Sequence, residues 1–183
     1  MIQLRDVRPG DRQQLLHWRN LPDVARWMYT DHEITDAAHD RWFDGIVGDP
    51  TRRYWMITAD ADAVGLVNLT DIDTSHRRCE FGVYLGAREA RGTGAGSAAL
   101  FLALDHAFVD LALDRVSASA MADNSEAIMA YERLGLRREA YMRGHVRKGD
   151  VAHDVVGLAI LRDEWLLVRP AIEAGLRSKG LIA

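Results

Sequence analysis

The chain has 183 residues, a hydrophobic fraction of 48% and a formal net charge of −4 at pH 7. This length and apolar content suit one domain with its own core, and the acidic balance gives no reason to expect a nucleic-acid partner. A single cysteine, Cys79, excludes an internal disulfide, and the absence of a long apolar run or an apolar N-terminal signal region leads us to expect a cytoplasmic protein without a membrane partner.

The first half of the chain predicts a strand, then helical segments, then consecutive strands. Thr35 or Asp36 can cap the third helical segment, because both side chains carry an oxygen that accepts a backbone hydrogen bond. The turn at 60–62 makes the first two of the consecutive strands a hairpin. The expected elements are a strand at 2–7, helices at 12–20, 21–28 and 35–47, and strands at 53–59, 63–72 and 77–85.

The second half of the chain alternates helices and strands. The order of all the elements predicts an α+β domain with a mixed sheet, over residues 1–170. Residues 171–183 are expected to be the end of the last helix and a tail. The expected elements are helices at 96–113, 125–135 and 163–174, and strands at 115–122, 136–147 and 151–161.

A glycine-rich stretch, EARGTGAGSAAL at 89–100, stands between a strand and a helix. Each glycine weakens a helix by roughly 1 kcal/mol relative to alanine, so three of them at a helix start need a reason. The free N–H groups and the positive dipole of a helix N-terminus form an anion site, and glycine lets a phosphate approach the backbone. Arg91 adds a charged fork. The stretch therefore predicts a pyrophosphate cradle, against the alternative of a flexible surface loop.

Two other nucleotide motifs fit this stretch badly. A Walker loop requires a lysine after its last glycine, and none follows Gly96. A dinucleotide fingerprint belongs early in a βαβ unit, whereas three consecutive strands precede this loop.

The glycine stretch is followed by a strand and by DNSEAIMAYERLGL at 123–136. The pairing of R-G-x-G-x-G with a strand ending in Asn and A-x-x-x-Y-x-x-x-G resembles the GNAT superfamily of acetyl-CoA-dependent N-acetyltransferases, over nearly the whole chain from Ile2 to Trp165. The resemblance implies a mostly antiparallel sheet flanked by helices, with the strands at 80–85 and 115–122 splayed apart. It implies that acetyl-CoA is the co-substrate, held by a set of residues in the loop and the splayed strands: Phe81, Val83, Arg91, Gly92, Gly94, Gly96 and Asn124.

Tyr131 matches the tyrosine that in this superfamily protonates the leaving thiolate. Amine acetylation passes through a tetrahedral oxyanion and expels a thiolate, so it needs an acid for the sulfur. A phenol with a pKa near 10 can donate that proton. The alternative for Tyr131 is a packed helix aromatic with its hydroxyl at the surface. The general base is left unassigned, because Glu80 and a water chain are equally plausible.

The N-terminal half of the chain is expected to bind the acceptor amine. WRNLPDVARWMY at 18–29, followed by I-T-x-x-x-H-x-x-W-F at 34–43, resembles the branch that acetylates UDP-4-amino-4,6-dideoxy-N-acetyl-β-L-altrosamine in pseudaminic acid biosynthesis. The resemblance places Arg19, His39, Thr70 and Tyr84 in a nucleotide-sugar pocket, with Asp71 departing from the basic residue expected there. The guanidinium of Arg19 suits a pyrophosphate.

Simpler interpretations stand beside these assignments. Arg19 can be a surface ion-pair residue, His39 a helix-face histidine with its partners satisfied, and Cys79 a strand residue that is no nucleophile. The histidines show no metal-ligand spacing, so no metal is expected. A homodimer remains open. The alternatives for function are a ribosomal-protein N-terminal acetyltransferase, a polyamine or drug acetyltransferase, and a domain that binds CoA without catalysis.

Overall fold

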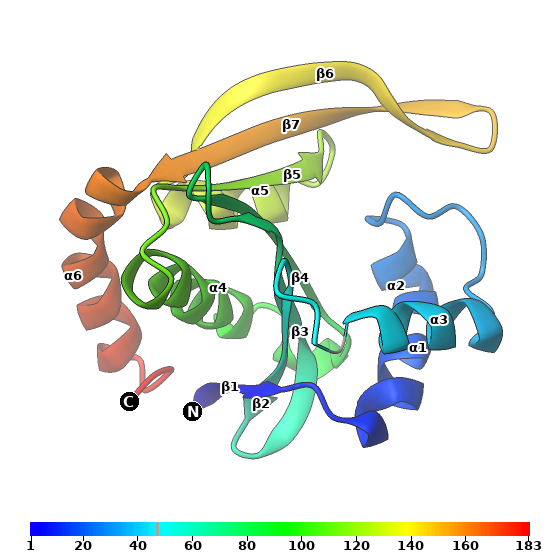
Figure 1. The fold of residues 1–183 in the computed structure, drawn as a ribbon, viewed down its shortest axis with the longest axis horizontal. Helices are drawn as coiled ribbons and strands as arrows, with labels where there is room; N and C mark the ends of the chain where they lie inside the picture. The colour runs from blue at the N-terminus through cyan, green and yellow to red at the C-terminus, as the bar shows by residue number, and fades with distance from the viewer. Residues whose placement is uncertain (47) are drawn as a thin grey trace.

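The computed structural model describes residues 1–46 and 48–183, shown as a ribbon in Figure 1. Every predicted strand and helix is present within these residues, with ends shifted by a few positions; the helix end expected at Val47 lies outside them. The largest difference concerns the helix expected at 96–113, because the α-helix ends at Asp105 and a π-helical turn follows at His106–Asp110. The last helix continues to Ser178. The helices are α1 (Arg12–Asn20), α2 (Pro22–Ala25), α3 (Asp36–Ile46), α4 (Ala95–Asp105), α5 (Ser125–Arg133) and α6 (Arg162–Ser178), and the strands are β1 (Ile2–Asp6), β2 (Arg53–Ala59), β3 (Asp62–Asp73), β4 (Arg78–Leu85), β5 (Arg115–Met121), β6 (Arg137–Lys148) and β7 (Val151–Leu161).

The strands form one sheet in the order β1-β2-β3-β4-β5-β7-β6. Neighbours are antiparallel except β4 and β5, which run parallel. These two pair through Arg78–Glu80 opposite Arg115–Ser117, and past Glu80 no further pairing is found in the described part of the chain. The predicted α+β fold with a mostly antiparallel sheet and a splayed central strand pair is therefore confirmed.

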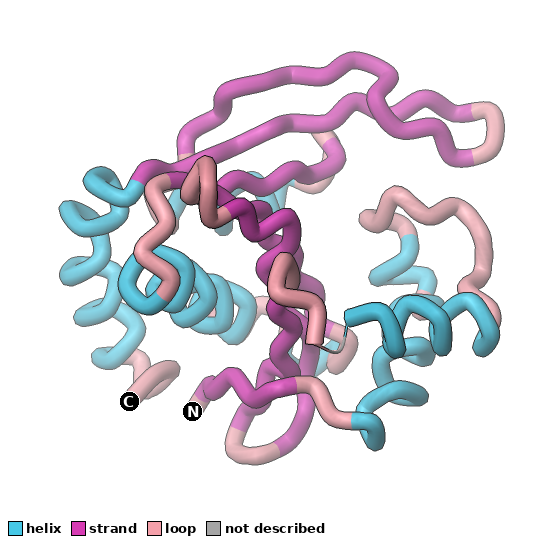
Figure 2. Tube along the Cα trace, viewed as in Figure 1, coloured by secondary structure: helices cyan, strands magenta, loops and turns pink. Residues whose placement is uncertain are grey.

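Helices cover both faces of the sheet, as the tube in Figure 2 and the ribbon show. We name the face packed against α4, α5 and α6 the α4 face, and the face packed against α1 and α3 the α1 face. Side chains alternate between the faces along each strand. Cys79 and Phe81 of β4, with Val116 and Ala118 of β5, are therefore on the α4 face.

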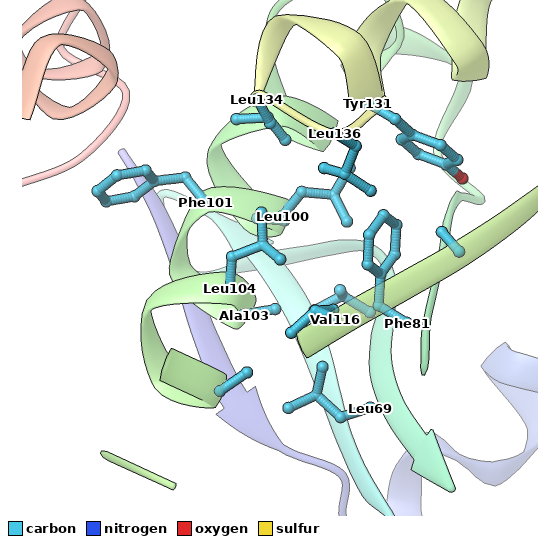
Figure 3. Close-up of a cluster of buried hydrophobic side chains, with 14 of the residues drawn as sticks. Leu69, Phe81, Leu100, Phe101, Ala103, Leu104, Val116, Tyr131, Leu134 and Leu136 are labelled. Atoms are coloured by element: carbon cyan, nitrogen blue, oxygen red, sulfur yellow. The ribbon is translucent and has the colours of Figure 1, made fainter. Parts of the chain in front are cut away.

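The α4 face holds the main core. Figure 3 shows part of it: Leu100, Ala103 and Leu104 of α4 lie against Leu69 of β3 and Val116 of β5. The small side chains of AGSAALFLALD bring α4 close to the sheet, which explains a helix start rich in glycine and alanine. Burial raises the pKa of the Cys79 thiol to about 12, so this cysteine stays protonated as a core residue.

The α1 face holds a second, smaller core of Leu15, Trp18, Phe43, Met56 and Leu66. Trp18 lies directly on the backbone after β4: a Cβ built at Gly86 would come within 2.1 Å of the indole ring. A side chain at position 86 would displace the indole, so Gly86 allows α1 to approach the end of β4.

The chain termini meet beside β1 (Figure 1). The Ile2 N–H donates to the Leu181 carbonyl at 2.7 Å, and Ile182 is buried in the main core. Residues beyond 170 are thus mostly helix, and their last turn packs against the domain.

Candidate functional site

The splayed strands leave one edge of β4 without a strand neighbour. Residues Phe81–Leu85 pair with β3 on one side, while the side that faces β5 has no strand partner among the described residues. Backbone N–H and C=O groups on such an edge need hydrogen-bond partners. A ligand with amide groups, lying between β4 and β5, would supply them. Phe81 and Val83, the residues predicted to hold the pantetheine arm, lie on this edge.

The glycine-rich loop leads from β4 to α4, which begins at Ala95. Gly92 and Gly94 have φ values of +75° and +92°, where side chains are disfavoured, and Gly96 is already helical. Thr93 shapes the loop, because its Oγ donates to the Ala90 carbonyl at 2.7 Å and accepts from the Ala95 N–H at 3.3 Å. The loop thus presents bare backbone at the N-terminus of an 11-residue helix, where anions are stabilised.

Arg91 is engaged within the protein. Its Nε and Nη2 donate to the Leu85 carbonyl at 3.2 and 3.1 Å, and Nη1 lies 3.3 Å from Oδ2 of Asp23. The guanidinium therefore ties the loop to the end of β4 and to α2. The cradle role predicted for the backbone N–H groups of the loop and the clamp role predicted for Arg91 both stay predictions.

Tyr131 lies on the α4 face where β4 and β5 separate. Its ring packs edge-on against Phe81, with centroids 4.9 Å apart, and in Figure 3 its hydroxyl points away from the core cluster. Burial, aided by the nearby Tyr29 phenol, raises the pKa of Tyr131 to about 12. The group is thus a protonated phenol at neutral pH and can act as an acid.

Asn124 precedes α5 and caps it. Its Oδ1 accepts the Ala127 N–H at 3.2 Å, which fixes the side chain at the helix start. The amide nitrogen of Asn124 is therefore the atom that would hydrogen-bond to pantetheine, and this contact remains a prediction.

On the α1 face, Arg19 of α1 and Tyr84 of β4 lie together. Arg19 donates to Thr30 Oγ through Nη2 at 3.4 Å, while its Nη1 and the Tyr84 hydroxyl are buried without a partner in the described residues. Burial lowers the pKa of Arg19, opposed by the phenols of Tyr84 and Tyr54, and burial raises the pKa of Tyr84. Polar groups removed from water without partners cost free energy, which a ligand hydrogen-bonding to them would recover.

Thr70 and His39 lie apart from this pair. Thr70 sits opposite Glu80, four residue pairs along the β3–β4 ladder from the Leu66–Tyr84 pair. His39 is 3% exposed and packs on Trp42 at 5.1 Å between ring centroids; both its ring nitrogens lack partners among the described residues. Burial lowers the pKa of His39, so the imidazole is neutral at pH 7. The structure therefore groups Arg19 with Tyr84, buries His39 against Trp42 and Phe43, and does not bring Thr70 to the pair.

The sequence model of the acetyltransferase (GNAT) domain matches residues 2–137. The chain belongs to the GNAT acetyltransferase family. Three curated relatives match at 27–28% identity. They are the putative ribosomal N-acetyltransferase YdaF of Bacillus subtilis (27% over 173 residues, 90% of this chain and 93% of that protein), acetyltransferase PseH of Campylobacter jejuni (27% over 135 residues, 72% and 82%) and spermidine N(1)-acetyltransferase of Escherichia coli K12 (28% over 151 residues, 77% and 80%).

A solved structure agrees with the fold. Spermidine N-acetyltransferase from Vibrio cholerae, in complex with CoA and spermine, superposes with a TM-score of 0.84 at 23% identity, over 90% of this chain and 98% of that chain. GNAT enzymes transfer the acetyl group of acetyl-CoA to an amine, and the predicted enzyme class and co-substrate are thus confirmed. The free β4 edge and the glycine loop fit such a ligand. The branch expected from the acceptor motifs is not confirmed, because relatives of several activities match about equally well.

Within residues 1–46 and 48–183, no helix combines the length and apolarity that crossing a bilayer requires. No cluster of three or more His, Cys, Asp or Glu side chains suited to a metal ion occurs in the same residues.

Two residues that shape the site, Asn20 and Tyr29, were not predicted from the sequence as site residues. Asn20 holds both backbone groups of Ile34, with its Oδ1 accepting and its Nδ2 donating at 2.9 Å each, so the loop before α3 is fixed to α1. Tyr29 hydrogen-bonds to Ser119 on β5 at 2.8 Å. Both residues stand in the W-R-N…W-M-Y stretch, which was the available signal, but the pattern does not say which members contact backbone.

Proposed function

We propose that the acceptor of this N-acetyltransferase is the 4-amino group of a UDP-linked amino-dideoxy sugar. The observation that carries the proposal is the buried Arg19 guanidinium, which has no carboxylate partner among the described residues. A buried cation without a counter-charge is costly, and a phosphate would offset that cost. The hydroxyl of Tyr84, buried beside it, offers the same ligand a further hydrogen bond.

The transfer itself would use groups at the β4–β5 separation. Acetyl-CoA supplies the acetyl group as a thioester. In the transfer, the bond from the amine nitrogen to the acetyl carbon forms and the carbon–sulfur bond breaks. The Tyr131 phenol gives its proton to the sulfur, and the proton lost by the nitrogen restores the phenol directly or through water. Donors on the free edge of β4 would stabilise the charge on the oxygen.

A polyamine is the second candidate acceptor. Relatives of this chain include spermidine acetyltransferases, and Glu80 and Asp71 place exposed carboxylates near the start of the splay. Carboxylates favour a polycation, whereas Arg19 would repel it. The two acceptors therefore demand opposite charges from the same face of the sheet.

A comparison of acceptors tests the proposal. The protein is incubated with acetyl-CoA and either UDP-4-amino-4,6-dideoxy-N-acetyl-β-L-altrosamine, spermidine or a peptide with a free N-terminus, and the release of CoA thiol is followed. We expect the highest kcat/KM with the UDP sugar. Preferred turnover of spermidine or of the peptide would reject the proposed acceptor.

Substitution of Arg19 sharpens this test. Arg19→Gln should raise the KM for the UDP sugar by about tenfold or more, because a charge-assisted hydrogen bond is worth about 1.5–3 kcal/mol. Arg41→Gln is the matched control, since Arg41 is exposed on α3. An unchanged KM in Arg19→Gln would remove Arg19 from the acceptor site.

A further inference from the structure

Residues 25–31, which start at the last residue of α2 and which we name the strap, cross the α1 face toward β5 and the tip of the β6–β7 hairpin. In Figure 1 the hairpin tip projects over the segment after α2. The Lys148 ammonium donates to the carbonyls of Ala25, Arg26 and Met28 at 2.9, 3.1 and 2.9 Å. The Gly149 N–H lies 3.4 Å from the Asp31 carboxylate. The hairpin tip therefore holds the strap at both its ends.

Tyr29 is the strap residue that reaches the sheet. Its hydroxyl lies 2.8 Å from Oγ of Ser119. Ser119 points to the α1 face, because Ala118 and Ala120 on either side of it pack in the main core. It also lies two residues beyond Ser117, the last β5 residue paired with β4. The Tyr29–Ser119 bond is thus located where the two strands begin to separate.

Tyr131 approaches the same place from the other side. Its ring contacts Phe81, the first β4 residue past the paired segment. Phe81 and Ser119 thus lie just past the paired segment on the two separating strands, with Tyr131 on the α4 face and Tyr29 on the α1 face. The thioester, which the acid must reach, would therefore lie between Tyr131 and the Tyr29–Ser119 pair.

We propose that Tyr29 and Ser119 form the acceptor-side wall of the acetyl-transfer site and hydrogen-bond the incoming amine, with Lys148 as a positioning residue that holds the strap. Two hydroxyls that share one hydrogen bond keep one O–H and further acceptor lone pairs. These groups can accept an amine N–H and so aim the nitrogen lone pair at the acetyl carbon. The proposal rests on acetyl transfer at the β4–β5 separation and holds for any of the candidate acceptors.

The kinetic test uses Tyr29→Phe, Ser119→Ala and the double variant. The acceptor is the one of the three amines above with the highest kcat/KM in the unchanged protein. Each single variant should lower kcat/KM for the amine about tenfold, the effect of one hydrogen bond, and the double variant should match the singles because both remove the same contact. The Kd of acetyl-CoA by calorimetry should stay within twofold. Unchanged kcat/KM, or losses that add in the double variant, would overturn the proposal.

Tyr141→Phe is the matched control for the lost hydroxyl. The Tyr141 hydroxyl donates to Asp154 at 2.6 Å, and Tyr141 is exposed on the edge strand β6, which β7 separates from β5. This substitution should leave kcat/KM unchanged. A loss as large as that of Tyr29→Phe would mean that the kinetic effect is not specific to the wall, and would contradict the proposal.

A readout without the acceptor separates this proposal from the proposed function. Amide hydrogen exchange at residues 26–34 should quicken in Tyr29→Phe and in Lys148→Met, while exchange in α4 stays unchanged. Lys148→Met should also raise the KM for the amine more than it lowers kcat, with partial rescue by Lys148→Arg and no effect of Lys179→Met. If none of the three amines is acetylated, the acceptor assignment fails and the exchange result alone tests the wall proposal. Unchanged exchange at residues 26–34 would then overturn the proposal that Tyr29 and Ser119 form the wall.

Discussion

Burial of the Tyr131 side chain determines the protonation state of its phenol. Its edge-on contact with Phe81 fixes the ring, and removal from water raises its pKa to about 12. The phenol therefore stays protonated across the physiological range, as a proton donor to a thiolate must. Without the family resemblance, the alternative of a packed aromatic was the simpler interpretation; the structure makes Tyr131 both packed and adjacent to the splayed strands.

The phenol of Tyr131 can be tested with Tyr131→Phe. The ring keeps its contact with Phe81, so folding and the Kd of acetyl-CoA should change little, while kcat falls by about 10²–10⁴ through loss of the acid. Because the pKa of Tyr131 is about 12, the unchanged enzyme should show no loss of kcat from this group between pH 7 and 10. Steady-state kinetics over that pH range check both points; a kcat within twofold of the unchanged enzyme would remove the acid assignment.

Gly86 lies beneath the Trp18 indole, so the pair gives a prediction about stability. Gly86→Ala places a Cβ 2.1 Å from the ring and should lower the free energy of unfolding by about 1–3 kcal/mol, as overpacked sites do. Gly45→Ala is the control, because a Cβ there meets no atom within 4 Å and alanine favours the α3 helix by about 1 kcal/mol. Urea denaturation should move the two variants in opposite directions; equal midpoints would contradict the packing.

At the scale of elements, the strand–loop–helix at 78–105 was predictable because its signals are local. Strand alternation ends near Leu85, glycines mark positive φ, and a continuous run of small and apolar residues marks α4. The Asp23 partner of Arg91 was not predictable, because Asp23 is 68 residues away in the sequence. An arginine beside a glycine loop indicates charge, and tertiary contacts determine where the guanidinium goes.

Two substitutions in the glycine loop distinguish backbone strain at Gly94 from a phosphate contact at Gly96. Gly94→Ala forces a side chain to φ +92° and brings its Cβ to 2.8 Å from Leu181, so both stability and CoA affinity should fall. Gly96→Ala meets Leu85 only at 3.8 Å and should keep stability while weakening CoA about tenfold if a phosphate approaches there.

Calorimetry with CoA and thermal unfolding measure the two effects of these variants. Gly175→Ala, which meets nothing within 4 Å in α6, is the control and should leave CoA affinity unchanged. If Gly96→Ala binds CoA as tightly as the control, the loop is not the cradle.

At the scale of the whole molecule, the order of the elements and the separation of β4 from β5 could be predicted from the sequence pattern and the family resemblance. The arrangement of side chains on the α1 face could not. That arrangement depends on contacts far apart in sequence, such as Tyr29 with Ser119 and Lys148 with the carbonyls after α2. His39 illustrates the limit: a motif position indicated a pocket residue, and the structure buries its ring against Trp42 and Phe43 of the same helix. Motifs mark which residues matter for a family and leave open whether they bind, pack or position.

The C-terminal residues link the sheet edge to the glycine loop, and this link is the basis of the last prediction. Leu181 accepts the Ile2 N–H and lies against Gly94, while Ile182 is buried. Deleting residues 180–183 should lower the free energy of unfolding by about 2–5 kcal/mol, the cost of removing a large buried aliphatic side chain, and should weaken CoA binding by loosening the loop. Deleting only the exposed Ala183 is the control and should change neither. Urea denaturation and calorimetry measure both; an unchanged Kd for CoA in the longer deletion would show that the loop keeps its shape without this support.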